Sequence, residues 1–407
     1  MACGGEPVEG NAGRLRTLSG ARLDGRRVFL RADLNVPIGS DGEVGDASRI
    51  DATLPTLHRL LDHGCAVVLA SHLGRPKGKP APEFSLAPVA RALSARLGRT
   101  VPLAPAVTGP EVRAQVAALG GGDMLLLENL RFDPREEKDD PVFAAELAEG
   151  LDLMVDDAFG AVHRAHASVH ALAEILESVA GLLVEHEVEA LGRLVAAERP
   201  FVVVLGGAKV ADKLAMLDTL ARRANRLVVG GGMANTFLVA QGARLGRSLV
   251  EPERLEDARR LLGQLGDRLV LPVDLVVGTG PDDASPRTVP STEVGEDDMA
   301  LDIGPESRAR FARALTGART AFWNGPMGMF EKAAYRAGTD AMAHAVASLG
   351  AAFTVVGGGD SVAALNQAGL ADRIGHVSTG GGASLEFVEG RELPGLAVLG
   401  YRSPVAR

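Results

Sequence analysis

The stretch 202-VVVLGGAKVADKL-214 decides the predicted fold, because it combines the elements of a phosphate-binding loop. Its apolar residues predict a buried strand, two glycines follow, and a helix then begins with Lys209 and Lys213 four positions apart. Glycines after a strand let a phosphate approach backbone N–H groups, and the next helix presents its positive end. Lysines four apart lie on one side of a helix, usually as a solvated pair, but the strand and glycines before this pair favour phosphate binding. The pattern G-x-x-x-x-G-K-S/T of the common P-loop is missing.

Similar strands recur along the chain. Short runs rich in Val and Leu alternate with Ala-rich stretches at helical spacing, such as 88–98 and 341–350. Near-continuous apolar strands that alternate with helices indicate parallel sheets covered on both faces. The predicted class is α/β, with two Rossmann-like parallel-sheet domains, each a three-layer αβα arrangement, and a cleft between them. The strand runs are 28-VFL-30, 66-AVVLAS-71, 124-MLLLEN-129, 202-VVVLGG-207, 227-LVVGGG-232 and 353-FTVVGGGD-360.

The composition of the 407 residues narrows the class of partner. The 43 Lys and Arg residues against 52 Asp and Glu give a net charge of −9, which argues against a general nucleic-acid or membrane-surface binder. Cys3 and Cys65 provide neither a disulfide framework nor metal-ligand spacing, which fits a reducing cytoplasm. No apolar run approaches the roughly 18–20 residues of a membrane span, and the first residues lack a signal-peptide pattern. We expect a cytoplasmic protein that holds anionic ligands by local positive charge.

The two halves of the chain end their strands differently. Strands of the first half run into polar and basic residues, whereas those of the second half run into glycines. Because ligands in open α/β sheets sit beyond the carboxyl ends of the strands, two domains with different ligand surfaces are expected. The predicted N-terminal domain covers residues 1–183, with a flexible extension over 1–15, and the C-terminal domain covers 199–390. The helical stretch 182–198 is predicted to connect them, with residues 184–198 as the interdomain helix.

Basic residues gather at the strand ends of the first half. Arginines suit phosphate and carboxylate, because the forked guanidinium binds two oxygens at once. A single arginine is more often an ordinary surface or ion-pair residue, but five at corresponding positions predict a site for a small, multiply anionic molecule. Asp33 and Asn35 follow a strand and are placed to fix its hydroxyl groups. The basic positions are Arg31, Arg49, Arg75, Arg131 and Arg164, with His72, His163 and His166 nearby; for His163 and His166 a structural role stays equally open.

Polar residues of the second half predict a nucleotide site. Asp360 follows three glycines at a strand end, where a carboxylate is placed to hold Mg²⁺ that bridges nucleotide phosphates. A helix N-cap is an equally open interpretation of Asp360, and the two roles are compatible. Glu331 follows 323-WNGPMGM-329 at a distance suited to ribose hydroxyls, and Trp323 is expected in the core rather than stacked on adenine.

These motifs, in this order, resemble the phosphoglycerate kinase family. The resemblance runs from about residue 17 to the end, and several of its segments are long. The segments are 27-RVFLRADLNVP-37, 71-SHLGRPKG-78, 83-EFSLAPVA-90, 127-LENLRF-132, 156-DDAFGAVHRAHAS-168, 199-RPFVVVLGGAKVADK-213, 230-GGGMANTFL-238, 302-DIGPES-307, 323-WNGPMGMFE-331, 357-GGGDS-361 and 378-STGGGASLE-386.

The resemblance implies an activity and an architecture. Such enzymes bind the glycerate substrate on an N-terminal basic patch and MgADP or MgATP on the C-terminal domain. Their domains close to transfer a phosphoryl group between 1,3-bisphosphoglycerate and ADP, which gives 3-phosphoglycerate and ATP. By matching motif positions, Arg49 and Lys213 would meet at the transferred group, and Asp360 would hold Mg²⁺. A monomer is the family expectation, and residues 391–407 are expected to return to the N-terminal domain.

The same resemblance implies two sets of binding residues. The glycerate compound would be held by Asp33, Leu34, Asn35, Arg49, His72, Leu73, Gly74, Arg75, Arg131 and Arg164. The nucleotide would be held by Gly207, Lys209, Lys213, Gly231, Leu301, Asn324, Pro326, Glu331, Gly357, Gly358, Gly359, Asp360 and Ser361. The chain departs from the family pattern at Asp156, where Asn is usual, at Asn235, where an aromatic residue is common, and at Ala300, which replaces a frequent glycine. These departures leave rate and nucleotide preference open.

Two other functions compete with this reading. A nicotinamide-dependent dehydrogenase also uses glycine-rich strand ends, but no convincing G-x-G-x-x-G follows an early strand with an acidic residue about 20 positions on. A non-catalytic nucleotide-binding scaffold of the same fold would be indicated by loss of Arg49, Lys213 or Asp360, and all three are present. Kinase chemistry needs no general base here, because the attacking phosphate or carboxylate oxygen is already ionised at pH 7, so positioning and charge stabilisation suffice.

Overall fold

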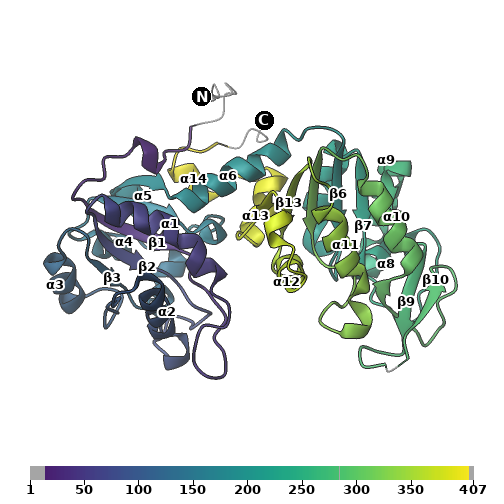
Figure 1. The fold of residues 1–407 in the computed structure, drawn as a ribbon, viewed down its shortest axis with the longest axis horizontal. Coiled ribbons are helices and arrows are strands. Elements are labelled where there is room, and N and C mark those ends of the chain that lie inside the picture. The colour runs from purple at the N-terminus through teal and green to yellow at the C-terminus, as the bar shows by residue number, and fades with distance from the viewer. Residues whose placement is uncertain (1–13, 284, 403–407) are drawn as a thin grey trace. The chain divides into compact units, whose positions relative to one another are not determined.

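The computed structural model describes residues 14–283 and 285–402, which form two compact units (Figure 1). Of the described residues, the N-terminal unit comprises 14–189 and 390–402, and the C-terminal unit comprises 190–283 and 285–389. Helix α6 (Leu182–Val195) contains the division between them and ends before the predicted connector does. The predicted flexible extension, residues 1–15, lies outside the described residues except for Arg14 and Leu15.

A five-stranded parallel sheet forms the centre of the N-terminal unit, in the order β3-β2-β1-β4-β5. Side chains of β1 alternate between two cores, with Val28 and Leu30 on one face and Phe29 on the other. Helices α1 and α2 cover the first face, and α3, α4 and α5 cover the second. The elements are β1 (Arg27–Ala32), α1 (Ser48–Asp62), β2 (Ala66–Ala70), α2 (Ala87–Leu97), α3 (Pro110–Ala118), β3 (Met124–Leu126), α4 (Pro141–Ala148), β4 (Leu153–Asp157), α5 (Ala171–Ile175) and β5 (Glu177–Ala180).

The last described segment packs within the N-terminal unit. In α14 (Pro394–Val398), the N–H of Gly395 donates to the carbonyl of Val162 at 2.9 Å. The N–H of Arg16 donates to the carbonyl of Leu399, also at 2.9 Å. Gly395 permits this contact, because a Cβ atom there would lie 2.7 Å from a methyl group of Val169. Both ends of the described chain therefore belong to one unit.

The C-terminal unit contains a six-stranded parallel sheet, in the order β14-β13-β12-β6-β7-β8. Helices α10, α11 and α12 pack on one face through Phe311, Met342 and Leu365. The elements are β6 (Phe201–Leu205), α7 (Leu214–Arg223), β7 (Arg226–Val229), α8 (Gly231–Ala240), α9 (Leu255–Leu265), β8 (Leu269–Val270), α10 (Pro305–Leu315), β12 (Thr320–Asn324), α11 (Ala337–Ala347), β13 (Phe353–Gly357), α12 (Gly359–Gln367), β14 (His376–Val377) and α13 (Gly382–Glu389). The expectation of two parallel-sheet α/β units is confirmed.

A small antiparallel sheet adds to the C-terminal unit and was not predicted. Strands β9 (Asp274–Gly278), β10 (Arg287–Pro290) and β11 (Met299–Ile303) form it in the order β10-β9-β11. Strand β10 is largely exposed, so its residues lack the apolar run that marks the buried strands. Within residues 14–283 and 285–402, no helix has the length and apolar character needed to cross a membrane.

Each parallel sheet reverses its strand order beside its first strand. In the N-terminal unit β2 lies on one side of β1 and β4 on the other, and in the C-terminal unit β7 and β12 flank β6. Such reversal points open a crevice at the carboxyl ends of the strands, where ligands of α/β proteins bind. The loops after β1, β2 and β4, and those after β6, β7, β12 and β13, are therefore the places to look for sites.

The opening stretch differs from its prediction in one respect. Strand β6 ends at Leu205, a loop follows, and a short 3₁₀ turn (Ala211–Lys213) precedes α7. Lys209 therefore lies in the loop, and the prediction that it shares a helix face with Lys213 is wrong. The physical reason is the Glu251 carboxylate, which accepts the N–H groups of Val210 and Ala211 and so fixes where the turn begins.

Candidate functional site

Two groups of residues at strand ends form candidate sites, one in each unit. The N-terminal group, the cationic cluster, lies at the ends of β1, β2 and β4, on the 3₁₀ turn Leu130–Phe132 and on α1. Its members are close enough for the charges of Arg31, Arg131 and Arg49 all to act on His72. The cluster consists of Arg31, Arg49, His72, Arg131, Arg164 and His166.

Hydrogen bonds tie the loops of the cationic cluster together. Arg49 makes an ion pair with Asp33, a carboxylate that is 7% exposed. The side-chain oxygen of Asn35 accepts the N–H of Gly74 at 2.9 Å, and Arg131 donates to the carbonyl of Gly74, also at 2.9 Å. Since these groups come from the ends of different strands, the bonds hold the predicted glycerate residues at a common edge of the sheet.

The histidines of the cluster are uncharged near neutral pH. Burial first, and then the charge of Arg31, lower the pKa of His72 well below its usual range. Arg31 Nη2 lies 3.1 Å from His72 Nδ1, and a guanidinium only donates, so Nδ1 is the acceptor. Burial and the charge of Arg131 lower the pKa of His166 to about 3. The positive charge of the cluster therefore comes from its arginines.

Arg31 is a buried structural residue of the cluster. Its side chain is 1% exposed, and its Nε donates to the hydroxyl of Ser168 at 2.9 Å. That hydroxyl donates in turn to the carboxylate of the fully buried Glu136 at 2.6 Å. Burial raises the pKa of Glu136, and the charge of Arg31 acts against this rise. Glu136 and Ser168 were missed by the sequence reasoning, because nothing near them in the sequence signals this pairing.

The remaining predicted glycerate residues are two exposed arginines, two buried leucines and a glycine. Arg75 and Arg164 are exposed, and Arg164 Nε donates to His163 Nε2 at 3.1 Å. Leu34 and Leu73 are buried in the apolar core, so their side chains pack the loops and only their backbone is placed to meet a ligand. Gly74 has a φ of 60°, and a Cβ atom there would lie 2.5 Å from the ring of Phe84.

The second candidate site is built from backbone loops at the carboxyl ends of β6, β7, β12 and β13. A Cβ atom on Gly231, which has a φ of 65°, would lie 2.8 Å from the backbone N and O of Gly207. A Cβ atom on Gly232 would lie 2.8 Å from the carbonyl of Ala208. Only glycine allows these loops to approach so closely, and the approach leaves backbone groups rather than side chains at the surface of the site.

Lys213 is folded back onto these loops. Its ammonium group donates to the carbonyl of Gly206 at 2.7 Å and to that of Asn324 at 3.1 Å. Burial lowers the pKa of Lys213 to about 8, and the charge of Asp360 acts in the opposite direction. Lys213 thus places a desolvated positive charge at the ends of β6 and β12. Lys209, in contrast, is exposed.

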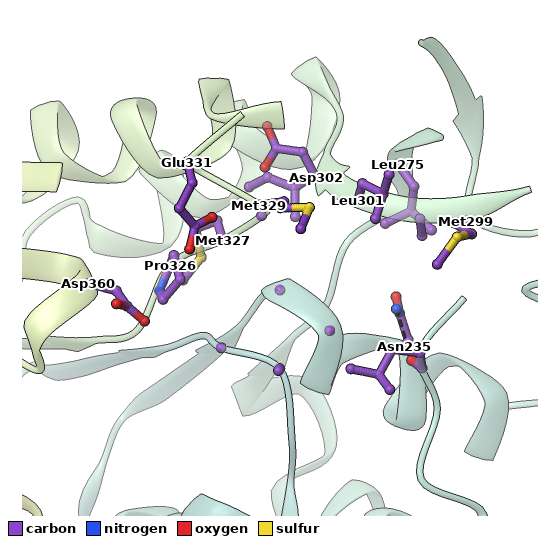
Figure 2. A pocket seen from close by; sticks show the side chains of 18 residues that line it. Asn235, Leu275, Met299, Leu301, Asp302, Pro326, Met327, Met329, Glu331 and Asp360 are labelled. Carbon is purple, nitrogen blue, oxygen red and sulfur yellow. Dashed lines mark hydrogen bonds between the residues drawn. The ribbon is translucent and has the colours of Figure 1, made fainter. Parts of the chain in front are cut away.

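A cavity of about 290 Å³, the glycine pocket, opens beside these loops (Figure 2). The predicted nucleotide residues that line it are Gly207, Gly231, Leu301, Pro326, Glu331 and Asp360. The predicted residues that do not line it are Lys209, Lys213, Asn324, Gly357, Gly358, Gly359 and Ser361. Asn324 and Ser361 are buried beneath the loops, where Ser361 accepts the N–H of Gly325 at 2.6 Å.

Asp360 presents a carboxylate to this pocket. It is exposed and belongs to the first turn of α12, whose N-cap position is held by Gly358. The N-cap interpretation of Asp360 is therefore wrong, and its carboxylate is left for a ligand. Magnesium is usually bound by one or two carboxylates together with substrate phosphates, so a single exposed carboxylate beside a phosphate loop fits this ion. Among the described residues, no three or more His, Cys, Asp or Glu side chains converge on a metal site.

Residues that the sequence reasoning did not assign also line the pocket. Asn235 from α8 is 2% exposed, and its amide nitrogen donates to the carbonyl of Leu249 at 3.1 Å. Burial raises the pKa of Asp302 to about 7, and its Oδ1 has no hydrogen-bond partner among the described residues. Trp323 is fully buried and donates to the carbonyl of Gly325 at 2.8 Å, as a core residue should. Its core placement confirms the prediction.

Comparison with known proteins decides the family. The family profile described as "Phosphoglycerate kinase" matches residues 18–391. The chain belongs to the phosphoglycerate kinase family. The phosphoglycerate kinase of Moorella thermoacetica is 52% identical over 388 residues, which are 94% of this chain and 98% of the relative. That of Thermus thermophilus is 53% identical over 392 residues, 95% of this chain and 100% of the relative.

Solved structures agree with the family assignment. Phosphoglycerate kinase from Coxiella burnetii matches with a TM-score of 0.84 and 40% identity, covering 95% of this chain and 99% of that one. The enzyme from Pyrococcus horikoshii matches with a TM-score of 0.84 and 32% identity, covering 95% and 98%. The chain is therefore a phosphotransferase of the phosphoglycerate kinase family. Neither a dehydrogenase nor a non-catalytic scaffold is favoured by these matches.

Proposed function

We propose that this enzyme transfers a phosphoryl group reversibly between the acyl phosphate of 1,3-bisphosphoglycerate and MgADP, giving 3-phosphoglycerate and MgATP. One observation carries the proposal: an arginine-rich cluster lies at the strand ends of one unit, and a phosphate loop with a desolvated lysine lies at those of the other. The family match supports the same pair of substrates.

The cationic cluster is proposed to hold the glycerate compound. Arg131 and Arg49 are anchored by bonds to Gly74 and Asp33, so their remaining donors are pre-oriented for phosphate or carboxylate oxygens. Asp33 and Asn35 are placed to accept and donate hydrogen bonds to hydroxyl groups. His72, neutral with Nδ1 already occupied by Arg31, offers Nε2–H as a donor. The exposed Arg75 and Arg164 complete the set.

The glycine pocket is proposed to hold the nucleotide. The N–H groups of the loop after β6 face its phosphates, and Glu331 accepts the ribose hydroxyls. The apolar end of the pocket, with Leu301, takes the base. Asp360 holds the Mg²⁺, which when bound neutralises phosphate charge during transfer. Lys209 is assigned to the phosphates as an exposed cation, and Gly357 to Gly359 with Asn324 and Ser361 shape the loops that receive them.

Arg49 and Lys213 are proposed to act on the transferred group itself. The nucleophile in either direction is an ionised oxygen, so no side chain has to remove a proton, and stabilising charge on the phosphoryl oxygens is the main task. Lys213 is suited to this because its charge is desolvated and already directed at the phosphate loop. The two substrates bind separate units, so the proposal requires the units to close over them and exclude water. We further propose a monomer that acts in the cytoplasm.

The test is release of ADP from MgATP with and without 3-phosphoglycerate, for the wild type and for Arg49→Ala. We expect turnover that depends on 3-phosphoglycerate and falls by at least 10²-fold in the variant. MgATP hydrolysis without the glycerate should be negligible. Glycerate-independent hydrolysis would contradict closure, and bound nucleotide without turnover in the wild type would contradict the enzymatic proposal.

A further inference from the structure

One polar side chain stands in the apolar end of the glycine pocket. This end is lined by Leu275, Met299 and Leu301, and Asn235 from α8 lies near them (Figure 2). Leu249, to which Asn235 is hydrogen-bonded, also lines the pocket. Asn235 is 2% exposed, so its carboxamide has left water almost completely. Burying a carboxamide among apolar side chains is costly unless its hydrogen bonds are made.

Only one side of this carboxamide is used by the protein. Its Nδ2 donates to the carbonyl of Leu249 at 3.1 Å. A carbonyl only accepts, so this bond fixes which end of the amide is nitrogen. Among the described residues, none donates a hydrogen bond to Oδ1, and Asn235 lines the cavity (Figure 2). The Oδ1 acceptor and the second N–H of Nδ2 are therefore both left for a ligand at the cavity wall.

The position of Asn235 indicates which part of a nucleotide it meets. Gly207 and Asp360, the residues suited to phosphates and magnesium, line the same cavity. Figure 2 places Asp360 and Pro326 at one end, with Asn235 and Met299 at the other. A nucleotide that keeps its phosphates at the glycine loops would bring its base to Asn235.

We propose that Asn235 reads the edge of the base and makes the site prefer adenine to guanine. This inference rests on the proposed nucleotide function of the pocket. Adenine carries an amino donor next to a ring-nitrogen acceptor, and a carboxamide matches that pair with its oxygen and its N–H. Guanine presents a carbonyl oxygen in place of the amino group, so two acceptors would face each other in a buried site. Discrimination by such pairs corresponds to roughly tenfold or more in affinity.

The test compares the dissociation constants of ADP, GDP and purine riboside 5′-diphosphate, which lacks the amino group, by calorimetry with Mg²⁺. In the wild type we expect ADP to bind about tenfold or more tightly than either of the others. This comparison uses only the wild type, so it does not depend on whether a variant folds. In Asn235→Leu the three constants should converge to within about threefold, chiefly through weaker binding of ADP. Met299→Leu, an apolar change in the same wall, should keep the wild-type ratios.

Each outcome separates the base preference from the function on which it rests. Equal binding of ADP and purine riboside 5′-diphosphate by the wild type would overturn the role of Asn235 while leaving the kinase proposal intact. An Asn235→Leu variant that keeps the full preference for ADP would do the same. If none of the three nucleotides binds the wild type, both the base preference and the nucleotide site are wrong.

Discussion

Replacing Asp156 by Asn should stabilise the N-terminal unit above pH 6. Asp156, the next-to-last residue of β4, has a fully buried carboxyl group, and burial raises its pKa from 3.8 to about 6. Its Oδ1 accepts the N–H of Ala158 at 3.0 Å, whereas its Oδ2 has no hydrogen-bond partner among the described residues. An amide keeps the first bond and carries no charge, so it removes the cost of ionising a buried group.

The size of the effect follows from the pKa. The folded state holds the proton more tightly than the unfolded chain, so the free energy of unfolding falls as pH rises from about 4 to 6. A shift of about two pKa units lowers the free energy of unfolding by roughly 3 kcal/mol above pH 6 and by about 1 kcal/mol at pH 4.5, relative to low pH. An amide N–H left without an acceptor at the place of Oδ2 would cost about 1 kcal/mol. We therefore expect Asp156→Asn to raise the free energy of unfolding by about 2 kcal/mol at pH 8 and to leave it almost unchanged at pH 4.5.

Urea unfolding measured unit by unit tests this expectation. Samples equilibrated in urea at pH 4.5 or 8 receive a short deuterium pulse at one common pH, and mass spectrometry reads peptides from β1 and β4. These peptides report on the N-terminal unit alone, so independent unfolding of the other unit does not confuse the midpoint. Asp62→Asn is the matched control, because this exposed residue at the end of α1 should change the free energy of unfolding by less than about 0.5 kcal/mol. A gain that is the same at both pH values would refute the reasoning.

Further predictions concern the C-terminal unit and the transferred group. Lys213→Ala and Arg49→Ala should each lower kcat by about 10² to 10³, measured by coupled turnover, and near-normal activity in either would remove that residue from the proposed transfer step. The pKa of Lys213 is about 8 in the free protein, and bound phosphates should raise it. Binding of ADP near pH 8 should therefore take up a fraction of a proton. Calorimetry would detect this uptake as a binding enthalpy that depends on the buffer. The uptake due to Lys213 should be lost in Lys213→Ala at pH 8, and near pH 6, where Lys213 is already protonated, the wild type and this variant should show the same buffer dependence. Gly231→Ala should lower the free energy of unfolding by about 1–3 kcal/mol and weaken nucleotide binding, because the added Cβ would clash with the backbone of Gly207. Gly263→Ala is the control: this glycine lies in open space on α9, so the change should be neutral or stabilising.

The parallel strands could be predicted from the sequence because both of their faces are buried. Runs such as those of β2 and β6 are apolar throughout, and the polar or glycine residues that follow mark the edge where ligands bind. The antiparallel sheet around β10 escaped prediction because its residues are largely exposed and carry no such run.

The layer of residues behind the candidate sites could not be predicted. Glu251 accepts the N–H of Val210, which lies 41 positions away, and Glu136 accepts from Ser168, 32 positions away. Such bonds depend on which strand ends become neighbours, and spacing along the chain does not encode that. The same limit explains the misplacement of Lys209, since the helix start is set by Glu251 and not by the local sequence.

The return of the last described segment to the N-terminal unit affects the order in which the two units can complete their contacts during synthesis. Residues near 395–399 supply bonds to Val162 and Arg16, whereas every residue of the C-terminal unit precedes position 390. Because a ribosome makes the chain from its N-terminus, all of residues 190–389 are synthesised before residues 395–399, which complete the contacts of the unit that was begun first. All residues of the C-terminal unit are thus made earlier, whereas the surface around Val162 and Val169 stays uncovered until residues 395–399 have been synthesised.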